Sequence, residues 1–309
     1  MNIDFAGQAG IVTGAGRGMG RAFALDLARR GARLILNGRP REEGGACEIE
    51  DVAAEIGRAG GQVHIVYASV DGRYGADRVA DAALERFGSI DFLINNAGIL
   101  RNGPFEALSP TDFEEVLKVH LAGSFFLGQR AFVAMKEKEY GRIVNVSSTT
   151  ALVEVSGLAN YAAAKGGVLG LTRAMAIEGG SHGIKVNALV PSAIGQMQAA
   201  SPIPGFAERF GNLRERLWPR MAPNTVTPLA VYLASLPCER NGEIWTACAG
   251  RFARVAVCFA SGWVASDPDS VAAEDIAENI GLIASLDGGF EPRELDDIYR
   301  DIIERLPRS

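Results

Sequence analysis

The sequence predicts an α/β protein built on a single doubly wound parallel sheet with helices on both faces and a C-terminal extension. Three observations lead to this prediction. Short apolar runs of strand length alternate with amphipathic stretches of helical length along most of the chain. The runs are apolar throughout rather than alternating, which is typical of strands covered by helices on both faces. A glycine-rich turn follows the first run.

The expected elements follow one another in a regular order. The first expected helix has Phe23 and Leu27 four residues apart on one face, and Gly31 is placed to end it. Because crossovers between parallel strands are right-handed, the alternation predicts a Rossmann-like sheet. The expected strands lie at 10–13, 33–37, 63–67, 92–94, 143–146 and 184–190, and the expected helices lie at 19–30, 72–87, 111–136 and 161–179.

We predict that residues 1–309 form one domain with additions, because no Pro/Gly/Ser-rich linker divides the chain. Residues 41–60 indicate a long loop and a helix after the second strand. Residues 195–222 hold three prolines and little periodicity, which indicates a mobile substrate-lid segment. The extension, residues 251–309, carries a helical apolar stripe for which core packing is a simpler interpretation than partner binding. The stripe consists of Leu295, Ile298, Tyr299, Ile302 and Leu306.

Composition excludes several classes of protein. The chain has 309 residues, 48% of them hydrophobic and 22% charged, and a net charge of −6, which argues against disorder and against nucleic-acid binding. Its four cysteines match no zinc pattern and are too sparse for a disulfide framework, and its three histidines lie far apart. We see no secretory signal and no apolar run that could cross a bilayer. We therefore expect a cytoplasmic protein without a metal, a membrane or a nucleic-acid partner.

The glycine-rich turn opens the first expected helix. Residues 13–20 read Thr-Gly-Ala-Gly-Arg-Gly-Met-Gly, with glycines at Gly14, Gly18 and Gly20. Glycine lets the backbone turn sharply and approach a pyrophosphate, whose charge is stabilised by the helix N-terminus. Glycine turns are common in βα units, and the evidence for a dinucleotide-binding turn here is its position directly after the first strand. We expect it to bind a dinucleotide.

The end of the second expected strand bears on the choice of nicotinamide cofactor. An NAD enzyme has an acidic side chain there that hydrogen-bonds to the ribose 2′-hydroxyl, whereas this sequence reads Asn37, Gly38, Arg39. Gly38 leaves room, and Arg39, joined by Arg17, offers a planar cation suited to a 2′-phosphate. We therefore favour NADP(H). The alternative, that both arginines are solvated surface residues, keeps NAD(H) possible.

A tyrosine and a lysine stand four residues apart in the last expected helix. Tyr161 and Lys165 therefore share a helix face. An ammonium beside a phenol favours the phenolate and is expected to lower the tyrosine pKa toward working pH. Such a tyrosine can give a proton to a carbonyl oxygen or take one from an alcohol. Because Tyr/Lys pairs are common on ordinary helices, the pair gains meaning only from the motifs around it.

Those motifs resemble the short-chain dehydrogenase/reductase family. The glycine turn, the Asn-Asn-Ala-Gly run from Asn95 to Gly98, and Ser148, Tyr161 and Lys165 match that family in order and spacing. The resemblance covers roughly residues 5–250. It implies a fold of the Rossmann type and hydride transfer to or from a nicotinamide cofactor.

The resemblance also implies a role for each matching residue. Tyr161 would be the general acid/base, Lys165 would lower its pKa and bind the nicotinamide ribose, and Ser148 would polarise the substrate carbonyl. Ser147 is expected to pack or cap instead. Family members are usually homotetramers or homodimers built through the helices at 111–136 and 161–179. The residues implied in cofactor binding are Gly14, Arg17, Gly18, Met19, Gly20, Gly38, Arg39, Ser69, Val70, Asn95, Ala97, Gly98, Tyr161, Lys165, Pro191 and Ile194.

The sequence departs from the family pattern in two places. His120 stands where an asparagine usually helps to hold a water in a proton relay to the lysine. It can act through its backbone carbonyl, relay protons through its ring, or be an ordinary buried histidine. After the sixth strand the usual Pro-Gly is replaced by Pro191 and Ser192, and Gln196 replaces a frequent threonine. The contact with the nicotinamide carboxamide is therefore less clear than the others.

One branch of the family is more similar than the rest. The Val-His-Leu-Ala-Gly-Ser-Phe run at 119–125 and the segment 95–101 are similar to the (3R)-hydroxyacyl-CoA dehydrogenase unit of the peroxisomal multifunctional β-oxidation enzyme. That branch typically uses NAD and has an acid where Gly38 stands. Two hypotheses follow. The first is an NAD(P)-dependent enzyme interconverting a secondary alcohol and a ketone on a bulky or 3-oxoacyl-type substrate. The second is a catalytically silent NADP(H)-binding regulator of the same fold.

Overall fold

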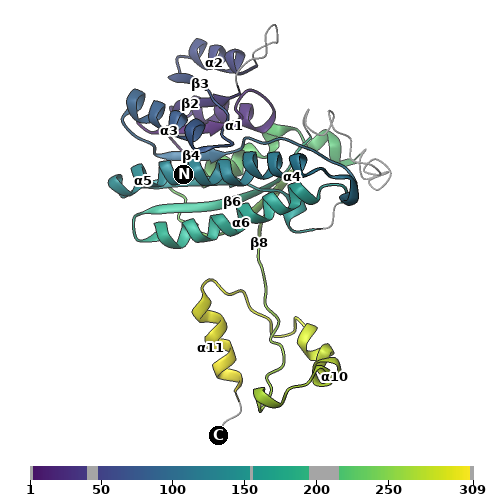
Figure 1. Cartoon of the computed structure of the whole chain (residues 1–309). Coiled ribbons are helices and arrows are strands. Elements are labelled where there is room, and N and C mark those ends of the chain that lie inside the picture. The colour runs from purple at the N-terminus through teal and green to yellow at the C-terminus, as the bar shows by residue number, and fades with distance from the viewer. Residues whose placement is uncertain (1–2, 40–47, 154–155, 195–215, 307–309) are drawn as a thin grey trace. The chain divides into compact units, whose positions relative to one another are not determined.

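The protein is described by a computed structural model for residues 3–39, 48–153, 156–194 and 216–306 (Figure 1). It contains one eight-stranded sheet in the order β3-β2-β1-β4-β5-β6-β7-β8. The strands from β1 to β7 pair in parallel. The strands are β1 (Ala9–Thr13), β2 (Arg33–Gly38), β3 (Val63–Tyr67), β4 (Phe92–Asn95), β5 (Gly141–Val146), β6 (Ile184–Ser192), β7 (Ile244–Cys248) and β8 (Arg251–Val255). The predicted fold class is confirmed.

Helices cover both faces of the sheet, and the strands alternate between them. Val12 and Leu34 point into a core with α1 and α9, whereas their neighbours Ile11 and Ile35 point into a second core with α3 and α5. Both faces are therefore apolar, as the strand composition indicates. The helices of this unit are α1 (Gly18–Arg29), α2 (Glu48–Arg58), α3 (Arg73–Phe87), α4 (Pro110–Leu117), α5 (Gly123–Lys138), α6 (Ala159–Gly180) and α9 (Thr227–Ala234).

The stretch expected as one helix at 111–136 is divided in the structure. α4 runs into a π-helical turn, η2 (Lys118–Ala122), before α5 begins at Gly123. A π turn inserts one extra residue per turn without changing the apolar pattern strongly, so periodicity alone does not reveal it. The turn buries His120 against α6. Such turns are frequent at functional sites.

The sheet also extends beyond its expected edge. Ala249 and Gly250, both at positive φ, join β7 to β8, which is the geometry of a tight antiparallel hairpin. The segment expected as an extension from residue 251 therefore begins as an eighth strand. The chain divides into two compact units, Met1–Arg254 and Val255–Ser309.

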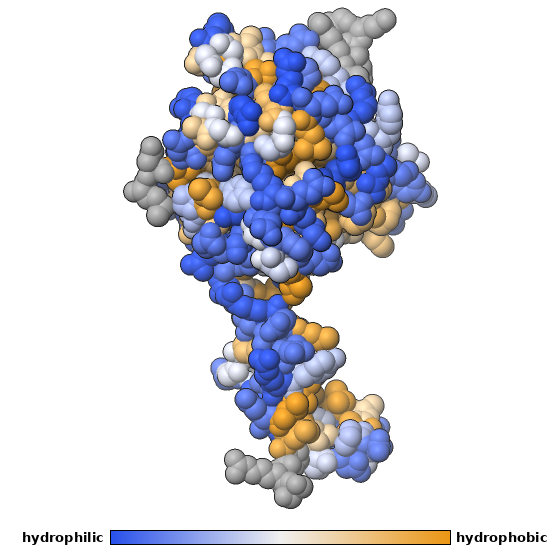
Figure 2. All heavy atoms as spheres, turned by 90° about the vertical axis from the view of Figure 1, so that its left-hand side faces the viewer, coloured by the Kyte–Doolittle hydropathy of each residue, from blue (hydrophilic) through white to orange (hydrophobic). Residues whose placement is uncertain are grey.

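The second unit has no core of its own among its described residues, 255–306. It contains a bridge between Phe259 and Phe290, α10 (Ala273–Ala284) and α11 (Leu295–Arg305). None of these residues is buried, and apolar surface gathers on this unit in Figure 2. The stripe expected to pack into a core is therefore exposed, with Leu295 at 60%. Within the second unit taken by itself, the stripe is not part of a core.

The carboxyl ends of the parallel strands bring the predicted motifs together. Thr13 pairs with Asn37, and Asn95 pairs with Asn145, so the segments that follow them leave the same edge of the sheet. Ligands of open α/β sheets bind at this edge. Among the described residues, no helix is both long enough and apolar enough to span a membrane.

Candidate active site

The glycine turn is built to receive a phosphate. Gly14 and Gly18 have positive φ, and a Cβ at Gly20 would collide with the Gly14 carbonyl. The Arg17 N-cap offers no side-chain hydrogen bond to the first turn of α1. The N–H groups there are therefore available to an anion, and the residues present fit the pyrophosphate of a dinucleotide.

Thr13 joins this turn to the loop that follows β4. Its hydroxyl oxygen accepts hydrogen bonds from the N–H groups of Asn96 and Ala97, both at 2.9 Å. The Asn96 side chain donates back to the Thr13 carbonyl at 2.9 Å. The two predicted cofactor segments, the glycine turn and Asn95–Gly98, are therefore one rigid surface.

The adenosine end of the expected cofactor site contains an acid that the sequence analysis missed. Glu48, the first residue of α2, lies 3.9 Å from the Arg17 guanidinium. The next residue, Ile49, packs against Gly38, where a Cβ would lie 3.0 Å from its Cδ1. Arg39 is exposed. Glu48 lies ten residues after the strand end, and the intervening residues 40–47 lie outside the described part of the chain.

The expected catalytic residues converge at the carboxyl ends of β5 and β6. Ser148 caps the short helix η3 (Thr149–Ala151), and its hydroxyl oxygen accepts from the Thr150 N–H at 3.2 Å. Tyr161 lies in the first turn of α6, and the Lys165 ammonium lies 5.6 Å from its ring centroid. Ser147 instead donates to the Lys165 carbonyl at 2.9 Å and is buried, as expected for a packing residue.

Burial controls the protonation of this pair. It raises the pKa of Tyr161 to about 12, and only the hydrogen bond from Ser148 opposes this. It lowers the pKa of Lys165 to about 7, and the ammonium donates to the Val146 carbonyl at 2.6 Å. The Tyr161 pKa therefore lies above its ordinary value rather than below it as expected, because burial is the largest influence on the phenol. At neutral pH a pKa in this direction favours the protonated phenol.

His120 lies directly behind the tyrosine. Its ring is buried and meets the Tyr161 ring edge-on, with centroids 5.0 Å apart. Its Nε2 lies 2.8 Å from the Ile99 carbonyl oxygen and 3.1 Å from the Ile99 nitrogen. The shorter contact favours the tautomer in which Nε2 carries the proton. Nδ1 then remains a buried acceptor with no hydrogen-bond partner among the described residues.

The environment keeps this imidazole neutral. Burial, reinforced by the positive charge of Lys165, holds the His120 pKa well below its ordinary value. The His120 backbone carbonyl accepts a hydrogen bond from the Ser124 hydroxyl at 2.7 Å. Gly98 is required beside it, because a Cβ there would collide with the imidazole. The ring therefore has a fixed orientation and one free acceptor.

Buried amides support the floor of the site. Asn95 donates to the Asn145 side chain at 2.9 Å, and Asn145 donates to the Thr172 hydroxyl at 3.0 Å. This chain links β4, β5 and α6 through groups that are all buried. Because such groups are costly when left unpaired, the chain fixes α6, and with it Tyr161, relative to the cofactor surface.

The remaining expected cofactor residues lie at the same edge. Ser69 and Val70 follow β3, Pro191 lies in β6, and the N–H of Ile194 donates to the Met221 carbonyl at 2.7 Å. Of the expected lid, residues 195–215, including Gln196, lie outside the described residues, and Trp218–Arg220 form a short 3-10 helix.

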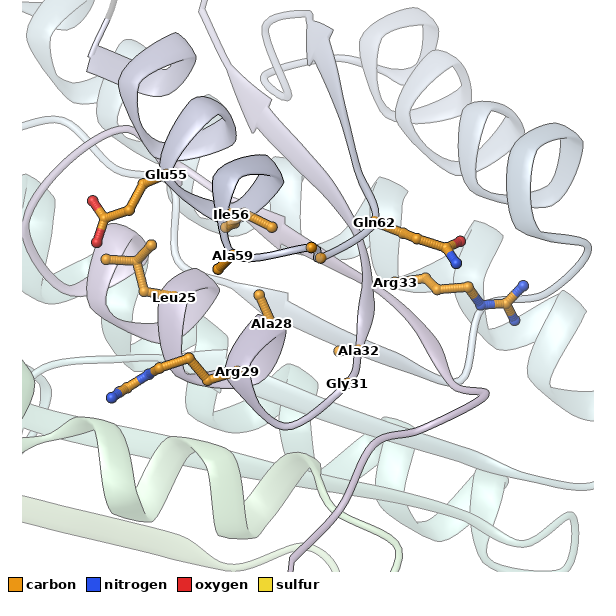
Figure 3. Close-up of a pocket in the computed structure, with 12 residues that line it drawn as sticks. Leu25, Ala28, Arg29, Gly31, Ala32, Arg33, Glu55, Ile56, Ala59 and Gln62 are labelled. Carbon is orange, nitrogen blue, oxygen red and sulfur yellow. The ribbon is translucent and has the colours of Figure 1, made fainter.

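A cavity of about 680 Å³ lies at the opposite end of the sheet (Figure 3). It is lined by the ends of α1 and α2 and by Arg33, the first residue of β2. The expected cofactor residue Gly38 is the last residue of the same strand. The cavity is therefore not part of the site described above.

Comparison with known proteins gives a consistent picture. The family described as short chain dehydrogenase matches residues 8–202. A short-chain type dehydrogenase/reductase of Mycobacterium tuberculosis is 35% identical over 282 residues, covering 90% of this chain and 94% of that protein. The peroxisomal multifunctional enzyme type 2 of Mus musculus is 34% identical over 98% of this chain, which spans 40% of that enzyme.

Solved structures agree with these relatives. The full-length peroxisomal multifunctional enzyme type 2 of Drosophila melanogaster superposes with a TM-score of 0.78 at 28% identity, covering 98% of this chain and 50% of that one. An NAD(P)-dependent gluconate 5-dehydrogenase from Beutenbergia cavernae, solved with bound NADP, has a TM-score of 0.71 at 34% identity and covers 80% of this chain and 97% of that one.

Proposed function

Because the chain belongs to the short-chain dehydrogenase family and is therefore an NAD(P)-dependent oxidoreductase acting on CH–OH groups, we propose that it interconverts a secondary alcohol and a ketone with Tyr161 as the general acid/base. The observation that carries this proposal is the convergence of Tyr161, Lys165 and Ser148 at the edge that holds the glycine turn. The bound cofactor supplies or accepts the hydride.

In the reducing direction the side chains complete the transfer. Ser148 donates a hydrogen bond to the carbonyl oxygen of the substrate and polarises it. As the carbonyl carbon gains the hydride, its oxygen takes the phenolic proton of Tyr161, and the product is the neutral alcohol. The protonated state that burial imposes on Tyr161 supports this direction. Lys165, in its charged form, stabilises the phenolate left behind.

His120 is proposed to return the proton through its ring. The His120 carbonyl already accepts one hydrogen bond, from the Ser124 hydroxyl, whereas Nδ1 is buried and accepts none among the described residues. The charge of Lys165 acts on the His120 ring, which supports a relay between the two groups. We expect His120→Ala to lower kcat about ten- to a hundredfold, and Ser124→Ala to leave it unchanged. Unchanged kcat in His120→Ala, which keeps the backbone carbonyl, would place the relay on that carbonyl.

We favour NADP(H) as the cofactor and bulky or 3-oxoacyl compounds as substrates. Arg39 is exposed at the end of β2, and no acid stands at Asn37, Gly38 or Arg39, although Ile49 packs against Gly38. Glu48 beside Arg17 works against this preference. Titration is expected to give tighter binding of NADPH than of NADH, and Arg39→Asp should narrow the difference. Equal affinities in the wild type would contradict the preference.

The protein is proposed to form a homodimer or homotetramer. On α5 and α6, Phe125, Val133 and Ile177 are exposed, and both helices of the second unit present apolar side chains to solvent. A second copy of the chain would cover such surfaces.

A substrate panel tests the reaction. NADPH oxidation is measured with 3-oxoacyl thioesters, cyclic ketones and steroids, using the wild type and Ser148→Ala. We expect turnover of at least one class, and Ser148→Ala should lower kcat about a hundredfold without changing NADPH affinity. Tight NADP(H) binding with no turnover of any compound would favour the silent regulator instead.

A further inference from the structure

One side chain beside Tyr161 joins three segments around the site. Asn160 is fully buried as the second residue of α6. Its Nδ2 donates to the carbonyl of Arg101 at 2.9 Å and to that of Asp112 in α4 at 3.2 Å. Its Oδ1 accepts from the N–H of Tyr161 at 2.8 Å. Both hydrogens of the amide are therefore used, and its oxygen holds the backbone of the expected proton donor.

The bond to Tyr161 compensates for an unusual helix start. The N-cap of α6 is Leu158, which has no side-chain acceptor, so the first N–H groups of the helix lack a normal cap. Asn160 satisfies one of them from inside the helix. The position of Tyr161 thus depends directly on this amide.

The bond to Arg101 connects the tyrosine to the segment after β4. Residues 99–103 follow the Asn95–Gly98 surface at the carboxyl edge of the sheet, where ligands of such sheets bind. This segment is attached at three points: Ile99 to the His120 ring, Arg101 to Asn160, and the N–H of Gly103 to the Gly157 carbonyl at 3.0 Å. His120 and Asn160 both also contact Tyr161.

We propose that Asn160 is a positioning residue that sets the distance between the Tyr161 hydroxyl and the 99–103 segment, which forms a wall of the substrate site. The amide does not contact reacting atoms. It acts by hydrogen bonding to the backbone of Tyr161 and to the backbone of the 99–103 segment, which fixes the distance between them. A substrate that contacts 99–103 then presents its carbonyl oxygen to the Tyr161 hydroxyl. The assignment of the wall rests on the proposed function, but the mechanical link does not.

Hydrogen exchange tests the link without a substrate. Asn160→Ala should accelerate exchange of the Tyr161 amide and of the amides at 99–103 at least about tenfold, because it removes all three hydrogen bonds of the side chain. Asn160→Asp keeps an acceptor for the Tyr161 N–H and loses both donor bonds, so only the 99–103 amides should accelerate. This isosteric variant also serves if the alanine variant is too unstable to study.

A matched control separates positioning from general stability. Asn187 is equally buried and also joins main-chain groups, donating to the Arg240 carbonyl at 2.7 Å and accepting from the Glu243 N–H at 3.2 Å. Asn187→Ala should lower Tm by a similar amount. It should leave exchange at 99–103, and kcat, as in the wild type.

Kinetics complete the test. A misplacement of about 1 Å at a catalytic group costs about a hundredfold, so we expect Asn160→Ala to lower kcat ten- to a hundredfold and to change the Kd of NADPH less than threefold. Wild-type exchange at 99–103 in Asn160→Ala and Asn160→Asp would overturn the proposal, as would wild-type kcat in a variant whose Tm has fallen. If the wild type turns over no substrate, the proposed function fails while the exchange results still decide the link.

Discussion

The two units of the chain differ in how far their side chains are buried. The unit Met1–Arg254 buries apolar side chains on both faces of its sheet, and it even buries the lysine and the histidine of its site. The unit Val255–Ser309 has equally amphipathic helices but no buried residue in its described part. It also carries four basic and twelve acidic residues, a net charge of −8, against +2 for the rest of the chain. Amphipathic helices alone therefore do not make a core.

The difference has a direct consequence for function. Within the first unit, apolar packing outweighs the cost of taking Tyr161 and Lys165 out of water, which shifts the pKa values of both. The second unit has no such packing within itself, so its apolar faces are suited to binding another surface rather than to holding a reactive group.

The largest expected effect is the loss of a core side chain from the first unit. Phe23 is fully buried in α1, and Phe23→Ala should lower the free energy of unfolding by about 3–5 kcal/mol. Ile303→Ala, on exposed α11, should change it by less than about 0.5 kcal/mol. Urea unfolding of both variants measures the contrast. Equal losses would show that the second unit is packed as tightly as the first.

A smaller effect should come from the buried lysine and should depend on pH. The folded state lowers the pKa of Lys165 to about 7, so between pH 7 and the ordinary lysine value the unfolded chain binds more protons. The free energy of unfolding should therefore rise with pH across this window. The raised pKa of Tyr161 makes the folded state the stronger proton binder from its ordinary value up to about 12, so stability should fall there.

Unfolding of the wild type and Lys165→Met at pH 7, 8, 9 and 10 checks this dependence. The wild type should gain stability across the series, and Lys165→Met should have a flatter curve. Lys136→Met, at an exposed position on α5, is the matched control and should keep the wild-type slope. A rising curve of the same slope in Lys165→Met would assign the pH dependence to other groups.

The smallest effect on the stability of the first unit should come from removing the second unit. A chain that ends at Arg254 keeps both cores and all of the sheet except Val255, the last residue of β8. We expect its Tm to lie within about 4 °C of the full chain, equivalent to about 1 kcal/mol, and its affinity for NADPH to be unchanged. Sedimentation should give a lower mass if a second copy binds the removed helices. Failure of the truncated chain to fold would contradict the independence of the first unit.

Sequence alone predicted the parallel strands β1 to β6 to within about two residues, because each is a short apolar run between glycines or helices, but the parallel strand β7 was not among the expected strands. It did not predict β8, which carries Arg251 and Arg254 and is only partly buried. The π turn at His120 was also missed, since the apolar pattern continues through it. The amphipathic shape of α11 was recognised, but its exposure was not, because a stripe has the same pattern whether or not anything covers it.

The residues of the candidate site also divide into those that the sequence predicted and those that only the structure revealed. Tyr161, Lys165 and Ser148 were found because their order and spacing form a motif. Glu48 and Asn160 belong to no motif, and only the fold brings them to Arg17 and Arg101. The direction of the tyrosine pKa was missed because spacing reports which charges are near, whereas burial depends on the whole core.

The central claim is that the Tyr161 phenol supplies the proton. The most direct test is the single-turnover rate of ketone reduction, measured at saturating NADPH for the wild type and Tyr161→Phe, with cofactor occupancy verified for both. We expect the rate to fall about a thousandfold, the range typical for loss of a general acid, while the Kd of NADPH stays the same. Equal rates in the two proteins would contradict the claim.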